Sequence, residues 1–153
     1  MRITAKVDYA VRAVAELAAA PTGPVKKAVL AERQRIPVNF LENILADLRR
    51  AGIVASQRGA DGGYWLAQPA AEISVADVIR AVEGPLADVH GVPPEQVDYG
   101  GAARALQQVW VATRATLRNV LETVTLADIA AGDLPEPVPS LVAAPDAWAR
   151  RRG

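Results

Sequence analysis

The chain has 153 residues, 51% of them hydrophobic, and a formal net charge of zero at pH 7. This length accommodates one domain, or one small domain with an appendage, and the apolar content excludes a globally disordered chain. Cysteine is absent, which excludes disulfides, thiolate zinc sites, cysteine-ligated iron–sulfur clusters and thiol nucleophiles.

The charge is unevenly distributed along the chain. Residues 1–68 hold ten Lys or Arg and six Asp or Glu, net +4, whereas residues 69–153 hold seven and eleven, net −4. This asymmetry favours a polyanionic partner for the first half. The N-terminal apolar positions are interrupted by Lys6, Asp8, Arg12 and Glu16. We therefore expect no signal peptide, no membrane segment and a cytoplasmic protein.

Three helices are predicted in the first third of the chain. Apolar residues at three- and four-residue spacing predict a helix that Thr4 caps and that ends near Ala20. A short helix follows over 26–33, and a third one opens at Pro37 and ends at Gly52. The expected buried stripe of the third helix consists of Phe40, Leu41, Ile44, Leu45 and Leu48.

The spacing of the apolar residues then changes from that of a helix to that of short strands, which predicts a β-hairpin. The segments 53–58 and 64–68 flank GADGG, in which Asp61-Gly62 is a strong signal for a tight turn. Ser74 and Asp77 have the spacing of a capping box and open a helix that ends at Gly84. A loop rich in Pro and Gly comes next.

One long helix is predicted over 102–124, with a heptad-like apolar seam. The residues of this seam are Leu106, Trp110, Thr113, Leu117, Val120 and Val124. We expect the seam to form a homodimer interface, and the alternative is packing within the chain. Thr125 caps a last short helix, and the Pro-rich segment after it is expected to be extended or flexible.

The order helix, short helix, helix, glycine-tipped hairpin predicts a winged helix-turn-helix, in a mainly α fold with a small β wing. The third helix would read base edges in a major groove of double-stranded DNA, and Arg58 would enter a minor groove. The candidate DNA-binding residues are Arg2, Lys6, Lys26, Lys27, Pro37, Val38, Asn39, Phe40, Glu42, Asn43, Arg49, Arg50, Arg58, Gly59, Gly62, Gly63 and Tyr64.

The sequence also resembles the Rrf2-type family of bacterial transcription regulators, which includes IscR and NsrR. The resemblance covers residues 1–133 and rests on TAKVDYAVRAVAELA, FLENILADLRRAGIVASQRGADGGYWLAQP and EISVADVIRAVEGP. It implies a homodimer whose two heads bind an imperfect palindrome, and we expect a repressor. The expected division is a DNA-binding head over 1–84, a connecting loop with the dimerisation helix and a short helix over 85–133, and a flexible tail over 134–153.

Two departures from the family pattern matter. Many members hold an iron–sulfur cluster on three loop cysteines, but this loop offers only Asp88, His90, Glu95 and Asp98, so we expect no metal and no cofactor. Arg35 stands where members usually have glycine in the turn before the third helix. Its side chain would add a phosphate contact, or the turn would differ. Asp8 would oppose phosphate if it faced the DNA.

The sequence also bears on three other functions. With one His, no Cys and no Ser/His/Asp set, an enzyme is not expected. A winged-helix module that binds protein is disfavoured by the basic residues around the third helix. A regulator that needs a small-molecule effector stays open, with Trp65, Tyr99 and Trp110 as either pocket or core aromatics.

Overall fold

The computed structural model describes residues 2–20 and 22–149 of the chain. Its α-helices are α1 (Ala5–Ala19), α2 (Lys27–Gln34), α3 (Val38–Arg50), α4 (Val75–Glu83), α5 (Leu106–Leu121), α6 (Leu126–Ala131) and α7 (Val138–Val142). Strands β1 (Val54–Gln57) and β2 (Gly63–Leu66) form an antiparallel hairpin. Short 3-10 helices occupy Ala70–Glu72, Pro94–Gln96 and Gly101–Ala103. None of the described helices is long and apolar enough to cross a membrane.

The mainly helical fold with a small hairpin agrees with the prediction, and two segments differ in detail. The long helix begins four residues later than expected, because the chain first makes a 3-10 turn at Gly101–Ala103. The Pro-rich tail contains the one-turn helix α7, where we expected no regular structure. Pro139 lies in the first turn of α7, a position where a missing N–H costs the helix nothing.

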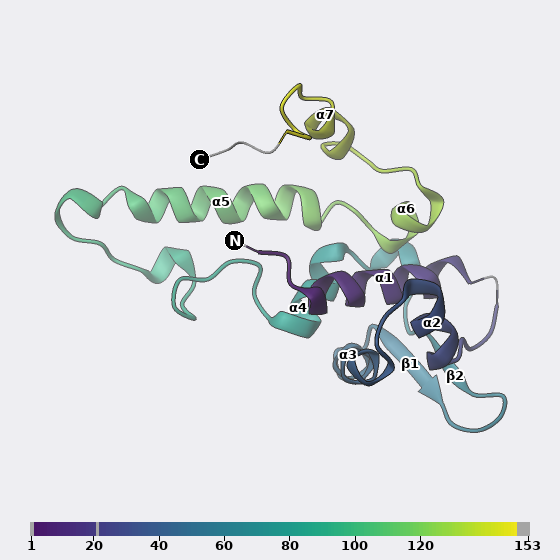
Figure 1. Cartoon of the computed structure of the whole chain (residues 1–153). Helices are drawn as coiled ribbons and strands as arrows, with labels where there is room; N and C mark the ends of the chain where they lie inside the picture. The colour runs from purple at the N-terminus through teal and green to yellow at the C-terminus, as the bar shows by residue number, and fades with distance from the viewer. Residues whose placement is uncertain (1, 21, 150–153) are drawn as a thin grey trace.

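The core lies where α1 crosses α3, α4 and α6 (Figure 1). The inner face of α3 consists of Leu41, Ile44, Leu45 and Leu48, all completely buried. Phe40, expected in this stripe, is instead 42% exposed. Its ring packs edge-on against Tyr9 of α1, with the ring centroids 5.6 Å apart. Phe40 therefore lies at the surface of the head, outside the buried face of α3.

The turn between α2 and α3 is a Schellman motif. The Ile36 N–H donates to the Ala31 carbonyl at 2.9 Å, and the Arg35 N–H donates to the Glu32 carbonyl at 3.2 Å. The motif requires a left-handed residue, and Arg35 takes this conformation with φ 51° and ψ 47°. A side chain there costs roughly 1 kcal/mol relative to glycine. The turn between α2 and α3 thus has the geometry usual for a helix-turn-helix, although its left-handed residue is arginine and not glycine.

The helix α6 belongs to the core of the head. Leu126 is completely buried in the same cluster as the α1 and α3 residues. The starts of α4 and α6 are also joined, because the Val75 N–H donates to the Val124 carbonyl and the Leu126 N–H donates to the Ile73 carbonyl, both at 2.9 Å. The expected boundary after residue 84 grouped α6 with the loop and α5. In the structure α6 packs in the head, and the loop and α5 lie outside it.

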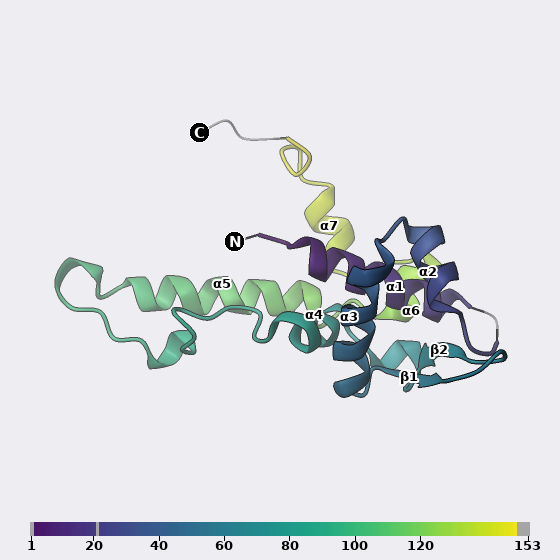
Figure 2. The same cartoon turned by 60° about the horizontal axis from the view of Figure 1, so that its bottom comes forward.

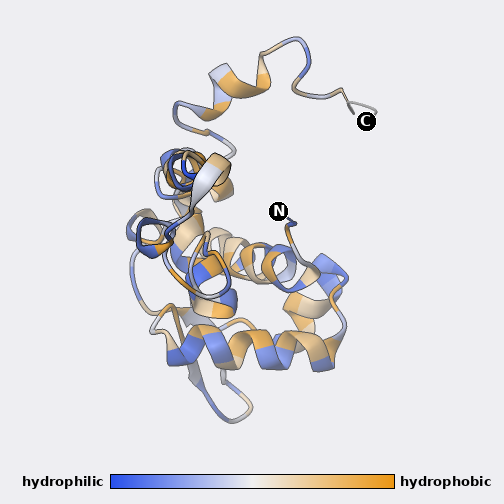
Figure 3. Ribbon diagram, turned by 90° about the vertical axis from the view of Figure 1, so that its left-hand side faces the viewer, coloured by the Kyte–Doolittle hydropathy of each residue, from blue (hydrophilic) through white to orange (hydrophobic). Residues whose placement is uncertain are grey.

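The helix α5 and the loop before it form an arm. Figures 1 and 2 show the loop running out from the head and α5 returning alongside it. None of the residues of α5 is buried. In Figure 3 the segment that carries α7 stands apart from the head and shows hydrophobic residues. Leu141 and Val142 of α7 are 51% and 42% exposed.

Two capping boxes stabilise the joined starts of α4 and α6, and the first of them yields a stability prediction. The Asp77 carboxylate accepts hydrogen bonds from the Ser74 N–H at 3.0 Å and the Ser74 hydroxyl at 2.7 Å. Burial acts to raise the pKa of Asp77, but the hydrogen bonds from Ser74, together with the nearby Arg80, outweigh it and lower the pKa below its ordinary value. A lowered folded-state pKa stabilises the fold above the unfolded value, and this contribution is lost as pH falls through the folded value.

We expect Asp77→Asn to lower the stability at pH 7 by about 1 kcal/mol, or roughly 2–4 °C in Tm. The difference from wild type should shrink when the pH falls well below 3.8, since wild-type Asp77 is then protonated. Thermal unfolding by circular dichroism at both pH values measures this. Asp133→Asn is the control for losing an exposed carboxylate. A difference that persists unchanged at low pH would contradict the assignment.

Candidate nucleic-acid interface

The outer face of α3 and the hairpin lie on the same side of the head (Figures 1 and 2). Between them is a groove of about 290 Å³. It is lined by Glu42, Leu45, Ala46 and Arg49 from α3 and by Ser56, Gln57, Arg58 and Tyr64 from the hairpin. Four of the candidate DNA-binding residues, Glu42, Arg49, Arg58 and Tyr64, therefore converge from two elements that are separate in sequence.

The hairpin is anchored to the head by backbone hydrogen bonds. Tyr64 of β2 exchanges two of them with Val25, in both directions at 2.8 Å. The tip depends on glycine at two positions. A Cβ on Gly62 would lie 2.2 Å from the Gln57 carbonyl oxygen, and one on Gly63 would lie 2.6 Å from the Val25 carbonyl oxygen. The glycines therefore permit the tight tip and its close approach to the segment before α2.

Arg58 is the basic residue at the base of the tip. Its side chain is exposed, and among the described residues it makes no hydrogen bond or ion pair. The guanidinium of Arg49 on α3, by contrast, donates to the Ser56 hydroxyl at 3.2 Å. This contact ties α3 to the hairpin and leaves Arg58 available to a partner.

The first two turns of α3 present polar side chains to solvent. Val38, Asn39 and Asn43 are exposed, and the Glu42 side chain is 62% exposed. The Glu42 carboxylate lies 3.0 Å from the Lys27 ammonium of α2. This pair orients Glu42 toward the groove side of α3. An oriented carboxylate can accept a hydrogen bond from the amino group of cytosine, and exposed amides can pair with adenine.

Other expected phosphate contacts are engaged within the chain. The Lys6 ammonium lies 2.8 Å from Asp47 and donates to the Val82 carbonyl at 2.6 Å. The hydrogen bond from Lys6 lowers the pKa of Asp47 below its ordinary value, with Arg50 adding to the effect. Lys6 thus joins α1 to α3 and α4. Asp8 forms an ion pair with Arg12 at 2.9 Å, which offsets its charge.

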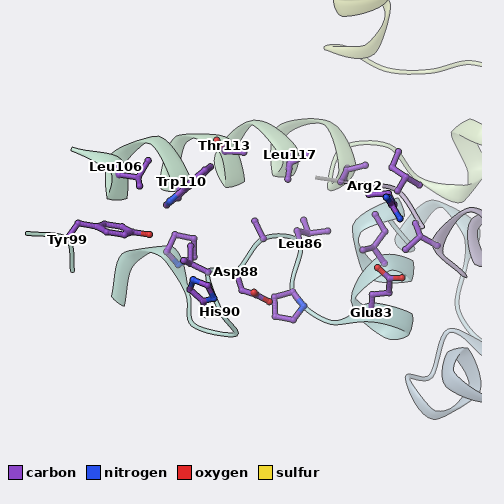
Figure 4. Close-up of a pocket in the computed structure, with 18 residues that line it drawn as sticks. Arg2, Glu83, Leu86, Asp88, His90, Tyr99, Leu106, Trp110, Thr113 and Leu117 are labelled. Atoms are coloured by element: carbon purple, nitrogen blue, oxygen red, sulfur yellow. The ribbon is translucent and has the colours of Figure 1, made fainter. Parts of the chain in front are cut away.

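The structure places Arg2 away from α3 and the hairpin. Arg2 lies near Glu83 at one end of a second, larger groove (Figure 4). Lys26, Pro37 and Arg50 are exposed on the head, as a DNA contact requires. Ser56 and Gln57 line the groove but were missed from the sequence. Their only signal was their place directly before Arg58 in the strand.

The larger groove, of about 1010 Å³, lies between α5, the loop 85–99 and the head (Figure 4). The predicted seam residues Leu106, Trp110, Thr113 and Leu117 line it, and Leu121 continues the stripe. The last two predicted seam residues lie outside this groove. Val120 does not line the groove, and Val124 is 6% exposed because it lies beyond α5 and packs within its own chain.

The loop residues with oxygen or nitrogen donors do not converge. Asp88 accepts a hydrogen bond from the Gly91 N–H at 3.0 Å, and Glu95 forms an ion pair with Arg114 at 2.6 Å. Within residues 2–20 and 22–149, no three His, Cys, Asp or Glu side chains are grouped to hold a metal ion. The aromatic residues also separate, since Tyr99 and Trp110 line the larger groove whereas Trp65 lies on β2.

Known proteins share both the sequence and this architecture. Residues 3–132 match the family model Rrf2, described as "Iron-dependent Transcriptional regulator". A Mycobacterium tuberculosis protein named as HTH-type transcriptional regulator Rv1287 is 51% identical over 142 residues, which cover 92% of this chain and 88% of that protein.

Two solved structures of regulators are also similar. That of CymR, the global cysteine regulator of B. subtilis, has a TM-score of 0.74 and 32% identity, over 86% of this chain and 98% of that one. That of T. potens IscR has a TM-score of 0.70 and 35% identity, over 86% and 88%. Family and relatives are transcription regulators rather than enzymes. The groove between α3 and the hairpin thus belongs to a winged helix-turn-helix head, and the chain belongs to the Rrf2 family of DNA-binding transcription regulators.

Proposed function

We propose that the chain binds double-stranded DNA in a sequence-specific manner as a homodimer, on an imperfect palindrome, in the cytoplasm. The observation that carries this proposal is the groove between α3 and the hairpin, where Glu42, Arg49 and Arg58 converge. With α3 in a major groove, the hairpin tip would lie over the neighbouring minor groove, whose negative potential favours a guanidinium.

The arm supports the homodimer. The helix α5 has 16 residues and an apolar stripe, and its contacts with α4 and with the loop before it leave none of its residues buried. The groove of about 1010 Å³ runs along this stripe. A second copy of α5 is the occupant with matching length and chemistry. Two heads joined in this way would contact two half-sites, which a two-fold axis relates as a palindrome.

The same proposal includes repression. A dimer seated across a promoter excludes the polymerase by occupancy alone, and this needs no further surface on the protein. Transcription in vitro measures repression, from a template that carries a site which the protein has selected from a random DNA pool. We expect fewer transcripts as the protein is added. An increase in transcripts would contradict repression and indicate an activator.

The family description includes iron, but the residues present do not fit an iron–sulfur cluster or an iron ion. Cysteine is absent from the whole chain. The loop carboxylates Asp88 and Glu95 are engaged with Gly91 and Arg114, and the described residues contain no group of three His, Cys, Asp or Glu side chains that includes His90. We therefore propose that DNA binding by this chain needs no cluster. A small-molecule effector stays an alternative, and addition of metal chelators should leave the affinity for DNA unchanged.

A footprint tests the two-headed arrangement. A duplex selected from a random pool by the protein should show two protected half-sites, with centres about one helical turn of DNA apart. One protected segment without internal symmetry would contradict the homodimer on a palindrome.

Glu42 provides a prediction about base preference. Glu42→Ala should reduce the discrimination between the selected site and single-base variants at one position by roughly 10-fold or more. The affinity for random DNA should rise slightly, because a negative charge is removed. Competition binding across base-substituted duplexes measures both. Glu32→Ala on α2 removes the same charge outside the groove, and it should leave the base preference unchanged. An unchanged preference in Glu42→Ala would remove Glu42 from base readout.

A further inference from the structure

Arg35, in the turn between α2 and α3, occupies a backbone position that normally requires glycine or asparagine. The Schellman motif at the end of α2 is complete, with hydrogen bonds from the Arg35 and Ile36 N–H groups to the Glu32 and Ala31 carbonyls. Its left-handed position, φ 51°, is one that glycine or asparagine normally occupies. The departure from glycine therefore did not produce a different turn. It placed an arginine in a backbone conformation that disfavours it.

The surroundings hold this turn in place without help from the Arg35 side chain. Ile36 is buried beside it, with 3% of its surface exposed. Arg12 of α1 donates to the Gln34 carbonyl and to the Gln34 side-chain oxygen, the latter at 3.0 Å. Arg12 is itself fixed by Asp8 and lies over the Tyr9 ring. The backbone at residue 35 is thus determined by its neighbours, and glycine would satisfy it at lower cost.

The side chain of Arg35 contributes nothing visible to the fold. It is exposed, and within the described ranges it makes no hydrogen bond or ion pair. The neighbouring Arg33, by contrast, forms an ion pair with Glu16 at 3.4 Å. Backbone strain that no contact of the side chain offsets is characteristic of positions that serve function.

The position of Arg35 points to the function that it serves. Arg35 lies three residues before α3 begins, next to the exposed residues Pro37, Val38 and Asn39. In a docked helix-turn-helix, the segment that leads into the second helix passes over the sugar–phosphate strand that borders the major groove. A guanidinium there meets phosphate oxygens, which it binds through paired N–H groups.

We propose that Arg35 is a DNA-backbone contact of this chain, made by a residue that occupies the glycine position of the turn. This inference rests on the proposed function of the α3–hairpin face. The contact is with phosphate and carries no sequence information. Its loss should weaken binding to all duplexes by a similar factor.

Three substitutions separate the charge from the backbone effect. Arg35→Gly and Arg35→Asn remove the charge and suit the left-handed conformation, whereas Arg35→Lys keeps the charge. We expect the first two to bind the selected duplex and a random duplex several-fold more weakly, with a salt slope lower by about one unit. Arg35→Lys should keep the wild-type slope. The Tm of Arg35→Gly and Arg35→Asn should equal or exceed that of wild type, which excludes unfolding as the cause.

The failures of the two proposals give different results in this titration. If wild type binds with a steep salt dependence and Arg35→Gly matches it in affinity and slope, the Arg35 contact is overturned and the proposed function stands. If wild type binds neither duplex, or binds without salt dependence, the proposed function fails and the Arg35 contact fails with it. A loss of affinity at the selected duplex alone would also overturn the contact, since it would indicate base readout.

Discussion

Arg58→Ala is expected to weaken binding to the selected DNA site by roughly 10- to 100-fold, which is the largest effect of any single substitution in the head. Arg58 projects from the base of the hairpin tip, is exposed, and has no partner among the described residues. Its guanidinium is therefore available to enter a minor groove. The loss should be greatest at sites with a narrow A/T-rich minor groove, where the negative potential is strongest.

The measurement is a fluorescence-anisotropy titration with duplexes that differ only in the A/T content beneath the hairpin. Arg104→Ala is the matched control, because it removes the same exposed side chain just before α5, whose first turn lies far from α3 and the hairpin (Figure 1). We expect Arg104→Ala to bind like wild type, and both variants to keep the wild-type Tm. Arg58→Lys should recover only part of the affinity, since an ammonium is more strongly hydrated. Equal affinity of Arg58→Ala and wild type for every duplex would contradict the wing contact.

Leu117→Asp is expected to convert the proposed homodimer into monomers. Leu117 belongs to the α5 stripe and lines the groove of about 1010 Å³ (Figure 4). A buried carboxylate without a partner strongly disfavours an apolar interface. Because no residue of α5 is buried within its own chain, the fold of the head should tolerate the change. The affinity for the palindrome should fall by roughly 100-fold or more through the loss of bivalent binding.

Light scattering after size-exclusion chromatography measures the oligomeric state, and binding to a whole palindrome and to a half-site measures the bivalency. The half-site affinity should be unchanged in Leu117→Asp. Asn119→Asp is the control, since it adds the same charge to an exposed position of α5 outside the groove. The dimeric account is contradicted if Leu117→Asp remains a dimer, or if wild type is monomeric at every concentration.

Local signals in the sequence predicted most of the helices and the hairpin. Thr4 accepts a hydrogen bond from the Val7 N–H, as its place before α1 predicted, and the Ser74–Asp77 box opens α4. Asp61-Gly62 lies in the turn of the hairpin, where a tight turn was expected. These features depend on neighbours within a few residues, so they can be read from spacing and residue type.

The features that the sequence did not predict depend on contacts between distant elements. Phe40 matches the apolar spacing of α3, yet it lies against Tyr9 at the surface. Val124 matches the seam spacing, but the chain has left α5 by then and pairs with the start of α4. The ion pairs of Lys6 with Asp47 and of Lys27 with Glu42 join different helices. The spacing of residues along the sequence does not predict ion pairs between different helices.

The salt dependence of DNA binding tests the central claim most directly. The protein would be titrated at several salt concentrations into a duplex selected from a random pool and into a scrambled duplex of the same composition. We predict tight binding to the selected duplex, at least 1,000-fold weaker binding to the scrambled one, and a steep linear fall of log affinity with log salt. Equal affinity for the two duplexes, or affinity that does not depend on salt, would contradict a sequence-specific DNA-binding function for the α3–hairpin face.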